Sequence, residues 1–309
     1  MATDREFAPD LARVLGPVDA WCTAHAWPRP AAADLQQVWL PLARWIRQEQ
    51  TQLGRPLVVG IGGLQGSGKS TLAQVLRLIL QTLDCPTVCL SLDDLYLTYA
   101  ERLALLSHDP RLIWRGPPGT HAVGLGCQVL DALRRGGRPV AVPRFEKALH
   151  GGQGDRQGFE TVLAAQVILF EGWFVGLYPR DLTQLTAWPA ALATPAGRQF
   201  ALDCNQRLDR YTPLWARLDR LVVLQMENWA CSLTWRGQAE PAGGMTPTQV
   251  AAFVTYFWQA LHPDLFHHPV AARGPADWVV PIKPDHSYGQ LYRPALSFQS
   301  AKASGPDPN

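Results

Sequence analysis

The sequence has little excess charge of either sign. Its 309 residues carry a formal net charge of +2, and no long block of like charges interrupts them. Proteins whose main partner is nucleic acid usually show a basic patch or stripe. The balance therefore argues against nucleic acid as the main partner. It leaves open an acidic small molecule, because such a ligand needs only a few well-placed cations.

The sequence also lacks paired cysteines and long apolar runs. Its six cysteines never show C-x-x-C spacing and there is no His-rich cluster, so no zinc or redox motif is predicted. The thiols are typical of a reduced, cytoplasmic protein. No stretch approaches the roughly 18 apolar residues of a membrane span, and the first residues resemble neither a secretory signal nor a basic transit peptide. We expect a cytoplasmic protein with no membrane partner.

Short apolar runs alternate with helical patterns along the chain. The runs of strand type cover 57–61, 87–92, 140–142, 167–170, 221–224 and 278–282. The helical patterns cover 34–46, 69–83, 125–135, 200–215, 229–238 and 246–260, with Asp34 as a plausible N-cap of the first. Near-continuous apolar strands between helices predict an α/β fold, a parallel sheet with helices on both faces. Ligands of such sheets bind beyond the carboxyl ends of the strands.

One glycine-rich segment matches a phosphate-binding motif completely. The pattern G-x-x-x-x-G-K-[ST] is met, between a strand and a helix, by Gly63, Leu64, Gln65, Gly66, Ser67, Gly68, Lys69 and Ser70, with Thr71 following. Glycines let backbone N–H groups turn toward phosphate oxygens, and the helix directs its positive end at the same anion. Lys69 then reaches the β- and γ-phosphates, and the Ser70 hydroxyl binds Mg²⁺. The sequence thus predicts a P-loop NTPase-type sheet that binds ATP.

Acidic residues follow two of the predicted strands. Glu171 ends the run 167–170, at the Walker B location, where it can hold Mg²⁺ directly or through water; the alternative is a solvated strand-end acid. Asp93 and Asp94 end the run 87–92. A kinase that phosphorylates an alcohol needs a carboxylate beside the acceptor hydroxyl, and we assign Asp93 as that base. The alternative is that both aspartates cap a helix. The guanine-reading motif N-K-x-D is absent from the sequence, which argues against a GTPase.

Further motifs make the chain resemble a known family. After the P-loop come, in order, S-L-D-D-L-Y-L-T at 91–98, R-G-P-P-G-T-H at 115–121, P-R-F-E-K at 143–147, G-D-R at 154–156 and E-G-W at 171–173. W-R-G-Q-A-E at 235–240, G-M-T at 244–246 and F-W-Q-A-L-H-P at 257–263 follow. From about Trp39 to Ile282 the chain resembles the D-glycerate 3-kinases of plants, fungi and cyanobacteria, within the phosphoribulokinase/uridine kinase group.

This resemblance implies a reaction. It implies that ATP, with Mg²⁺, phosphorylates the 3-hydroxyl of D-glycerate to 3-phosphoglycerate, the step that ends photorespiration in photosynthetic organisms. By position, Asp93 resembles the catalytic base, Glu171 the metal-linked acid, and Arg236 a lid arginine over the transferring phosphate. At one position the chain departs from the family pattern P-G-[ST]-H-D, because Ala122 stands where the pattern has an aspartate.

The acceptor site is predicted from loops next to the strand ends. Glycerate carries a carboxylate, for which Arg is the preferred partner. Besides Asp94, we expect substrate contacts from the following residues: Tyr96, Arg115, His121, Arg144, Lys147, Arg156 and Trp173. Taken singly, each of the cations is also explained as a solvated surface residue.

The chain is predicted to divide into three parts. Residues 1–54 form an N-terminal helical extension, 55–295 a P-loop kinase domain with acceptor loops and a lid, and 296–309 a flexible tail rich in Ser, Pro and Asp. Two other functions stay open. One is another small-molecule kinase of the same group, acting on pantothenate, a nucleoside or a sugar phosphate. The other is a nucleotide-binding regulator without catalysis.

Overall fold

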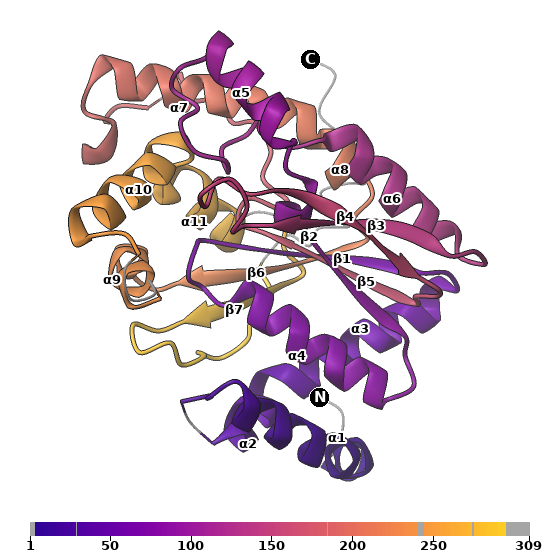
Figure 1. Cartoon of the computed structure of the whole chain (residues 1–309). Helices are drawn as coiled ribbons and strands as arrows, with labels where there is room; N and C mark the ends of the chain where they lie inside the picture. Colours follow the sequence, from indigo (N-terminus) through magenta and orange to yellow (C-terminus); the bar gives the residue numbers. More distant parts are fainter. Residues whose placement is uncertain (1–3, 29, 184, 240–243, 274, 295–309) are drawn as a thin grey trace.

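A parallel sheet forms the centre of the protein. The computed structural model describes residues 4–28, 30–183, 185–239, 244–273 and 275–294, and its parallel strands stand in the order β2-β5-β1-β6-β7 (Figure 1). The strands are β2 (Thr87–Ser91), β5 (Val167–Gly172), β1 (Leu57–Gly63), β6 (Arg220–Met226) and β7 (Trp278–Ile282). They coincide with five of the apolar runs, so the α/β fold predicted from the sequence is confirmed.

Helices cover both faces of this sheet. They are α1 (Asp4–Ala24), α2 (Ala31–Asp34), α3 (Leu40–Leu53), α4 (Lys69–Thr82), α5 (Tyr99–His108), α6 (Val123–Arg135), α7 (Pro195–Arg207), α8 (Thr212–Trp215), α9 (Cys231–Gln238), α10 (Pro247–Ala260) and α11 (Pro263–Arg273). Figure 1 shows α3 and α4 below the sheet and α6 and α8 above it. Every residue of β1 and β5 is buried, because strands enclosed between two helical layers expose neither face.

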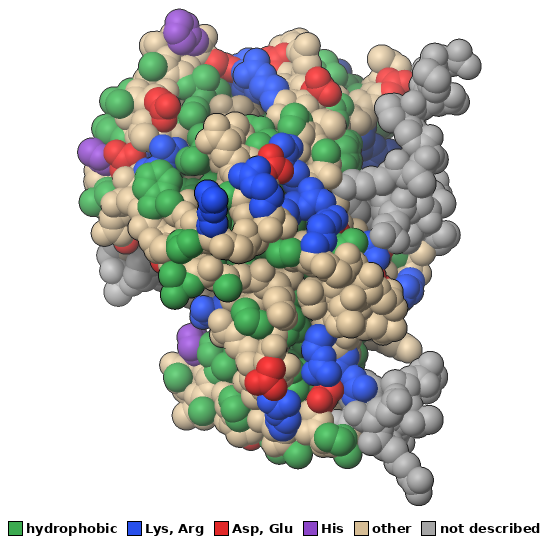
Figure 2. Space-filling view, turned by 90° about the vertical axis from the view of Figure 1, so that its right-hand side faces the viewer, with side chains coloured by type: hydrophobic (Ala, Val, Ile, Leu, Met, Phe, Trp, Pro, Cys, Tyr) green, Lys and Arg blue, Asp and Glu red, His purple; other side chains and the backbone are tan. Residues whose placement is uncertain are grey.

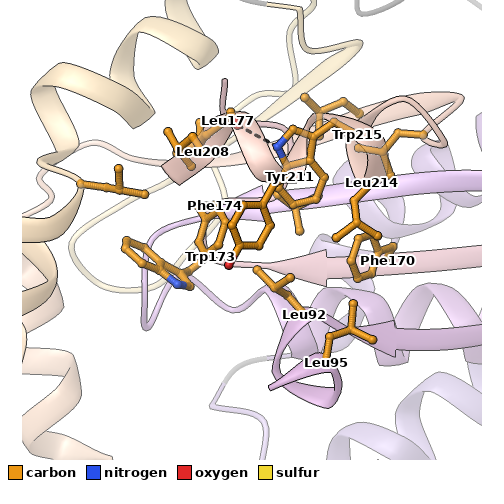
Figure 3. Close-up of a cluster of buried hydrophobic side chains, with 14 of the residues drawn as sticks. Leu92, Leu95, Phe170, Trp173, Phe174, Leu177, Leu208, Tyr211, Leu214 and Trp215 are labelled. Carbon is orange, nitrogen blue, oxygen red and sulfur yellow. Dashed lines mark hydrogen bonds between the residues drawn. The ribbon is translucent and has the colours of Figure 1, made fainter. Parts of the chain in front are cut away.

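Each face of the sheet has its own hydrophobic core. The core on the α4 side includes Trp39 and Leu76, and the core on the α6 side includes Phe174 and Trp215, all buried. Figure 3 shows the aromatic part of the second core, where the Trp215 indole donates to the Leu177 carbonyl (2.8 Å). None of the helices in the described ranges has the length and apolar character that a bilayer crossing needs.

The run at 140–142 does not join the parallel sheet. It begins β3 (Val140–Glu146), which pairs antiparallel with β4 (Asp155–Val162) in a separate hairpin. No sequence pattern marks β4, because all of its residues are exposed or half-buried and no continuous apolar run covers it. This corrects the expectation of one uninterrupted strand–helix alternation, and it places the P-R-F-E-K motif on the hairpin.

The N-terminal helices pack on α4 and α3 at the bottom of Figure 1. The predicted N-cap role of Asp34 is wrong, since Asp34 ends α2 and a π-helical turn, Leu35–Trp39, continues directly into α3. The Asp34 carboxylate instead accepts a hydrogen bond from the Trp27 indole (3.0 Å). The division at residue 54 stays a prediction, and the tail at 296–309 lies outside the described residues.

Other helix boundaries differ modestly from the sequence patterns. The predicted helix 200–215 is interrupted by a 3₁₀ turn, Leu208–Tyr211, between α7 and α8. The sequence patterns missed α5, none of whose residues is buried, because an exposed helix carries no apolar stripe. The sequence does contain a signal for the start of α5, because Thr98 and Glu101 have the spacing of a capping box and form one in the structure.

Candidate active site

The glycine-rich segment forms a tight turn between β1 and α4. Gly63, Gly66 and Gly68 all adopt positive φ angles, which side chains other than glycine rarely tolerate. At Gly63 a Cβ atom would also lie 2.7 Å from the Leu224 carbonyl oxygen, so any larger residue would displace β1 from β6. The sequence therefore prescribes a glycine-rich turn that leads directly into the N-terminus of α4, the arrangement that binds phosphate.

Two charged side chains are buried beside this turn. The Lys69 ammonium donates to the Leu64 carbonyl (2.8 Å), and burial lowers the pKa of Lys69, although Glu171 and Asp93 oppose the shift. The Ser70 hydroxyl donates to the Glu171 carboxylate (3.0 Å). Burial raises the pKa of Glu171, while Lys69 holds it back. β5, which carries Glu171, pairs directly with β1, so the predicted Walker B acid meets the P-loop serine.

The two aspartates after β2 have different surroundings. The Asp94 carboxylate accepts hydrogen bonds from the Ser91 amide (3.0 Å) and Arg144 (2.9 Å) and completes a capping box with Ser91. Asp93 faces the other way and pairs with the Lys147 ammonium at 2.7 Å. The cap interpretation thus describes Asp94, and Asp93 is the aspartate that faces the site. β5 lies between β2 and β1, so Asp93 follows a strand that is not adjacent to the P-loop strand.

The ionised form of Asp93 is stabilised by Lys147 and by the hydroxyl of Tyr96, which packs among other aromatic rings. Burial by itself raises the pKa of Asp93, but the Lys147 ammonium and the Tyr96 hydroxyl outweigh burial, so the pKa lies below its usual value. The His121 ring stacks on Tyr96, with ring centroids 4.6 Å apart, and its Nδ1 lies 2.8 Å from the Tyr211 hydroxyl. Burial lowers the pKa of His121 to about 3. His121 is therefore neutral near pH 7 and supports Tyr96 from behind.

A single cavity of about 770 Å³ joins the P-loop to Asp93. Its wall contains the buried Lys69 and the carboxylates of Asp93 and Glu171. The described residues that line it, in chain order, are Gln65, Gly66, Lys69, Ser70, Asp93, Tyr96, Trp114, Arg115, Lys147, Gly151, Gly152, Gln153, Glu171, Gly172, Trp173, Arg236, Gly244, Met245, Gln249, Phe253 and Phe257. The volume suits a small-molecule ligand pair rather than a macromolecule.

Only part of the predicted acceptor set reaches this cavity. Tyr96, Arg115, Lys147 and Trp173 line it. The structure places four other predicted contacts outside its wall: Asp94, His121, Arg144 and Arg156. The first two lie in the cap and behind Tyr96, as described above.

The two arginines outside the wall hold the surrounding segments together. Arg144 bridges Asp94 and Glu160 across the hairpin, with nitrogen–oxygen distances of 2.9 and 2.7 Å. Arg156 donates to the Tyr96 carbonyl at 3.1 Å. Both are therefore positioned to shape the site from behind its wall.

The sequence reasoning missed much of the cavity wall opposite the P-loop. Phe253 and Phe257 come from α10, and the hairpin loop supplies Gly152 and Gln153, whose carbonyls accept hydrogen bonds from Arg115 at 2.7 and 3.0 Å. The Arg236 guanidinium lies 5.4 Å from the Phe253 ring centroid. The helix α10 itself was predicted from the pattern at 246–260. The F-W-Q-A-L-H-P motif, which contains Phe257, was noted for the family resemblance, but no site role was assigned to it.

The P-loop residues fit a nucleotide phosphate chain. The Ser67 hydroxyl is buried and has no hydrogen-bond partner among the described residues. Buried polar atoms normally have partners, so the loop contains one unmatched polar atom, although Ser67 is not among the described residues that line the cavity. Positive-φ glycines on either side of Ser67, a buried ammonium and a Ser–Glu pair form the donor and acceptor set that a metal–nucleotide complex requires.

Known proteins resemble this chain in sequence and fold, although no protein-family model matches it. It is 33% identical over 231 residues to the uncharacterized kinase mug58 of Schizosaccharomyces pombe, covering 70% of this chain and 83% of that protein. It is 30% identical over 277 residues to the chloroplastic D-glycerate 3-kinase of Arabidopsis thaliana, covering 80% of this chain. The alignment spans 58% of the plant protein, which is less than two thirds of its length.

A solved structure extends the likeness to the fold. The D-glycerate 3-kinase of Cryptococcus neoformans superposes with a TM-score of 0.69 at 26% identity, and the match covers 82% of this chain and 98% of that one. The yeast relative exceeds 30% identity over most of its own length, and the fungal structure shares the site-bearing sheet. This protein therefore belongs to a family of P-loop kinases that includes mug58, and it is similar to the D-glycerate 3-kinases of a plant and a fungus.

Proposed function

We propose that the protein transfers the γ-phosphoryl group of ATP to the 3-hydroxyl of D-glycerate. The observation that carries this proposal is one cavity whose wall holds both Lys69 and Asp93, with Lys147 paired to Asp93 and Arg115 on the same wall. A kinase for a small carboxylate-bearing alcohol needs this combination of a phosphate site, a base and cations. The names of the plant and fungal relatives support the same acceptor.

At the nucleotide end, the P-loop amides and Lys69 would hold the phosphates, and Ser70 with Glu171 would hold Mg²⁺. ATP supplies the phosphoryl group, and Mg²⁺ neutralises charge on its oxygens. The Ser70 hydroxyl and the Glu171 carboxylate, 3.0 Å apart, are close enough to share one metal or its waters. Arg236, on the cavity wall, would add positive charge beside the transferring group.

At the acceptor end, Asp93 orients the hydroxyl and takes its proton as the new bond to phosphorus forms. Its pKa lies below the usual value, so the carboxylate is ionised and ready to accept that hydrogen bond. Lys147, which pairs with Asp93, and Arg115, which also lines the cavity, are the cations proposed for the glycerate carboxylate. Ala122, the departure from the family pattern, is absent from the described lining, so the residues that touch the acceptor are assigned without it.

Product analysis tests this assignment directly. Phosphorus NMR after incubation with ATP, Mg²⁺ and D-glycerate should show 3-phosphoglycerate, and L-glycerate, pantothenate, uridine and ribulose 5-phosphate should turn over far more slowly. A 2-phosphoglycerate product, or preferred turnover of uridine or pantothenate, would assign the cavity to another acceptor. In a photosynthetic cell the proposed reaction would end photorespiration. The cytoplasmic location and the three-part division of the chain also stay predictions.

A further inference from the structure

A second cavity lies apart from the active site, where the end of α5 approaches α7. It has a volume of about 550 Å³ and shares no lining residue with the active-site cavity. Figure 1 shows α5 and α7 together at the top of the molecule. The wall contains three arginines and one histidine but a single acid, in this order: Leu105, His108, Asp109, Pro110, Arg111, Leu112, Gly119, Arg207 and Arg210.

The acid does not satisfy all the arginines. Asp109 accepts hydrogen bonds from Arg111 (2.8 Å) and from Nη2 of Arg207, and Asp203, behind the wall, accepts from Arg111 (2.6 Å). Arg210 is exposed and makes no ion pair with any residue that the structure describes. Positive charge therefore exceeds negative charge around the cavity, unlike the matched ion pair of Arg217 with Asp131.

One buried atom in this wall has no structural explanation within the protein. Nη1 of Arg207 is fully buried and finds no hydrogen-bond partner among the described residues. A guanidinium that served only to tie α7 to Asp109 would leave that N–H group unsatisfied, which is unfavourable. The unmatched donor, together with the unpaired Arg210, is the pattern expected where an anion completes the site.

We propose that this cavity binds a small phosphorylated anion. Arg111, Arg207 and Arg210 approach from two segments, so they offer donors in several directions, which a tetrahedral phosphate accepts and a planar carboxylate matches less well. The volume admits a phosphate ester of metabolite size but is smaller than the active-site cavity. Gly119 lines the cavity and belongs to the same loop as His121, so the occupant contacts the segment that supports Tyr96.

Inorganic phosphate is a suitable probe, provided that the P-loop is filled. The full chain is saturated with Mg²⁺ and a non-hydrolysable ATP analogue, and phosphate is titrated calorimetrically at constant ionic strength. We expect one phosphate per chain, bound about 10-fold more weakly by Arg210→Gln. Arg138→Gln is the matched control, because Arg138 is also exposed and lies outside both cavities. Arg210→Lys should recover part of the affinity.

Three results would overturn the proposal. The first is that no phosphate binds at millimolar concentration, and the second is that Arg210→Gln binds phosphate as tightly as the parent. The third is that Arg138→Gln weakens phosphate binding as much as Arg210→Gln does, which would indicate a general charge effect. A malonate arm tests the ligand class: displacement of phosphate by malonate at lower concentration would reassign the cavity to dicarboxylates. Melting temperatures of the variants, which should match the parent because both arginines are exposed, establish that folding is unchanged.

Discussion

The nucleotide end and the acceptor end of the active-site cavity are built in different ways. The nucleotide end comes from one continuous segment, 63–71, with Glu171 from the adjacent strand, and its charged groups are buried. The acceptor end is assembled from separate segments that carry Asp93, Arg115 and Lys147. The Lys147 side chain is 62% exposed, although it pairs with Asp93.

This difference teaches which half of the site is rigid. A turn fixed by positive-φ glycines and packed against β6 has little freedom to adapt. It therefore suits the nucleotide phosphates, which stay the same whichever acceptor is used. Exposed cations on loops and a hairpin can be replaced without disturbing the hydrophobic core, so they suit the selection of different acceptors.

Away from the cavity, Figure 2 shows basic and acidic side chains interspersed over the face on the right of Figure 1.

The largest expected effect comes from the nucleotide end. Lys69→Ala removes the buried ammonium from the transferring phosphate, and we expect kcat to fall by about 10³–10⁵-fold, the range given for an arginine finger that stabilises the same charge. The fold should persist, since the Lys69 ammonium donates its hydrogen bond to the Leu64 carbonyl within the loop itself. Steady-state kinetics and circular dichroism measure both; parental turnover in the purified variant would place the phosphate site elsewhere.

Asp93→Asn tests the base at the acceptor end. The substitution keeps the size and removes the charge, so kcat should fall by about 10²–10⁴-fold with little change in ATP affinity. The loss should appear in kcat, because the proton is transferred in the transition state. Rapid kinetics with D-glycerate and equilibrium nucleotide binding separate the two quantities.

Asp94→Asn is the matched control for that variant. Asp94 closes the capping box and pairs with Arg144; Asn keeps an oxygen for the Ser91 amide but loses the charge facing Arg144, so the free energy of unfolding should fall by about 1 kcal/mol while much of kcat survives. Denaturant titration measures the stability. An inactive Asp94→Asn beside an active Asp93→Asn would exchange the roles assigned to the two aspartates.

Lys147→Gln separates acceptor binding from nucleotide binding. We expect KM for glycerate to rise about 10-fold, as for a lost charge-assisted hydrogen bond, with KM for ATP unchanged. Lys147 also lowers the pKa of Asp93, so without it burial prevails and that pKa rises. The acid limb of the kcat/KM profile should then move to higher pH. A limb that stays in place would show that another group controls it.

The smallest effect is expected for Tyr96→Phe. The variant keeps the ring that stacks on His121 and removes the hydroxyl that bonds Asp93. Loss of one such bond, ~1 kcal/mol, corresponds to a decrease in kcat of about 5-fold. The pKa of Asp93 should move up, as for Lys147→Gln. Activity equal to that of the parent would mean that Lys147 alone sets the charge of Asp93.

Local patterns predicted the sheet and the phosphate site because both depend on neighbouring residues. Buried strands such as β1 and β5 read as apolar runs, and the P-loop is one contiguous motif whose glycines follow from backbone geometry. The exposed hairpin strand β4 and the exposed helix α5 left no comparable pattern. Asp34 was assigned to a cap because its residue type favours caps, whereas a tertiary contact with Trp27 decided its place.

For the acceptor side, the sequence determined which charged and aromatic residues are available, and only the tertiary structure decided which of them meet. From the sequence we assign Asp93 as the base, but the alternative that both aspartates cap a helix stays open, because the two residues are adjacent in one motif. The fold turns Asp94 toward Ser91 and Arg144 and leaves Asp93 to face the cavity. Likewise Arg144 and Lys147 share one motif, but the alternation of a strand directs Arg144 behind the wall, and Lys147, just past β3, reaches the site.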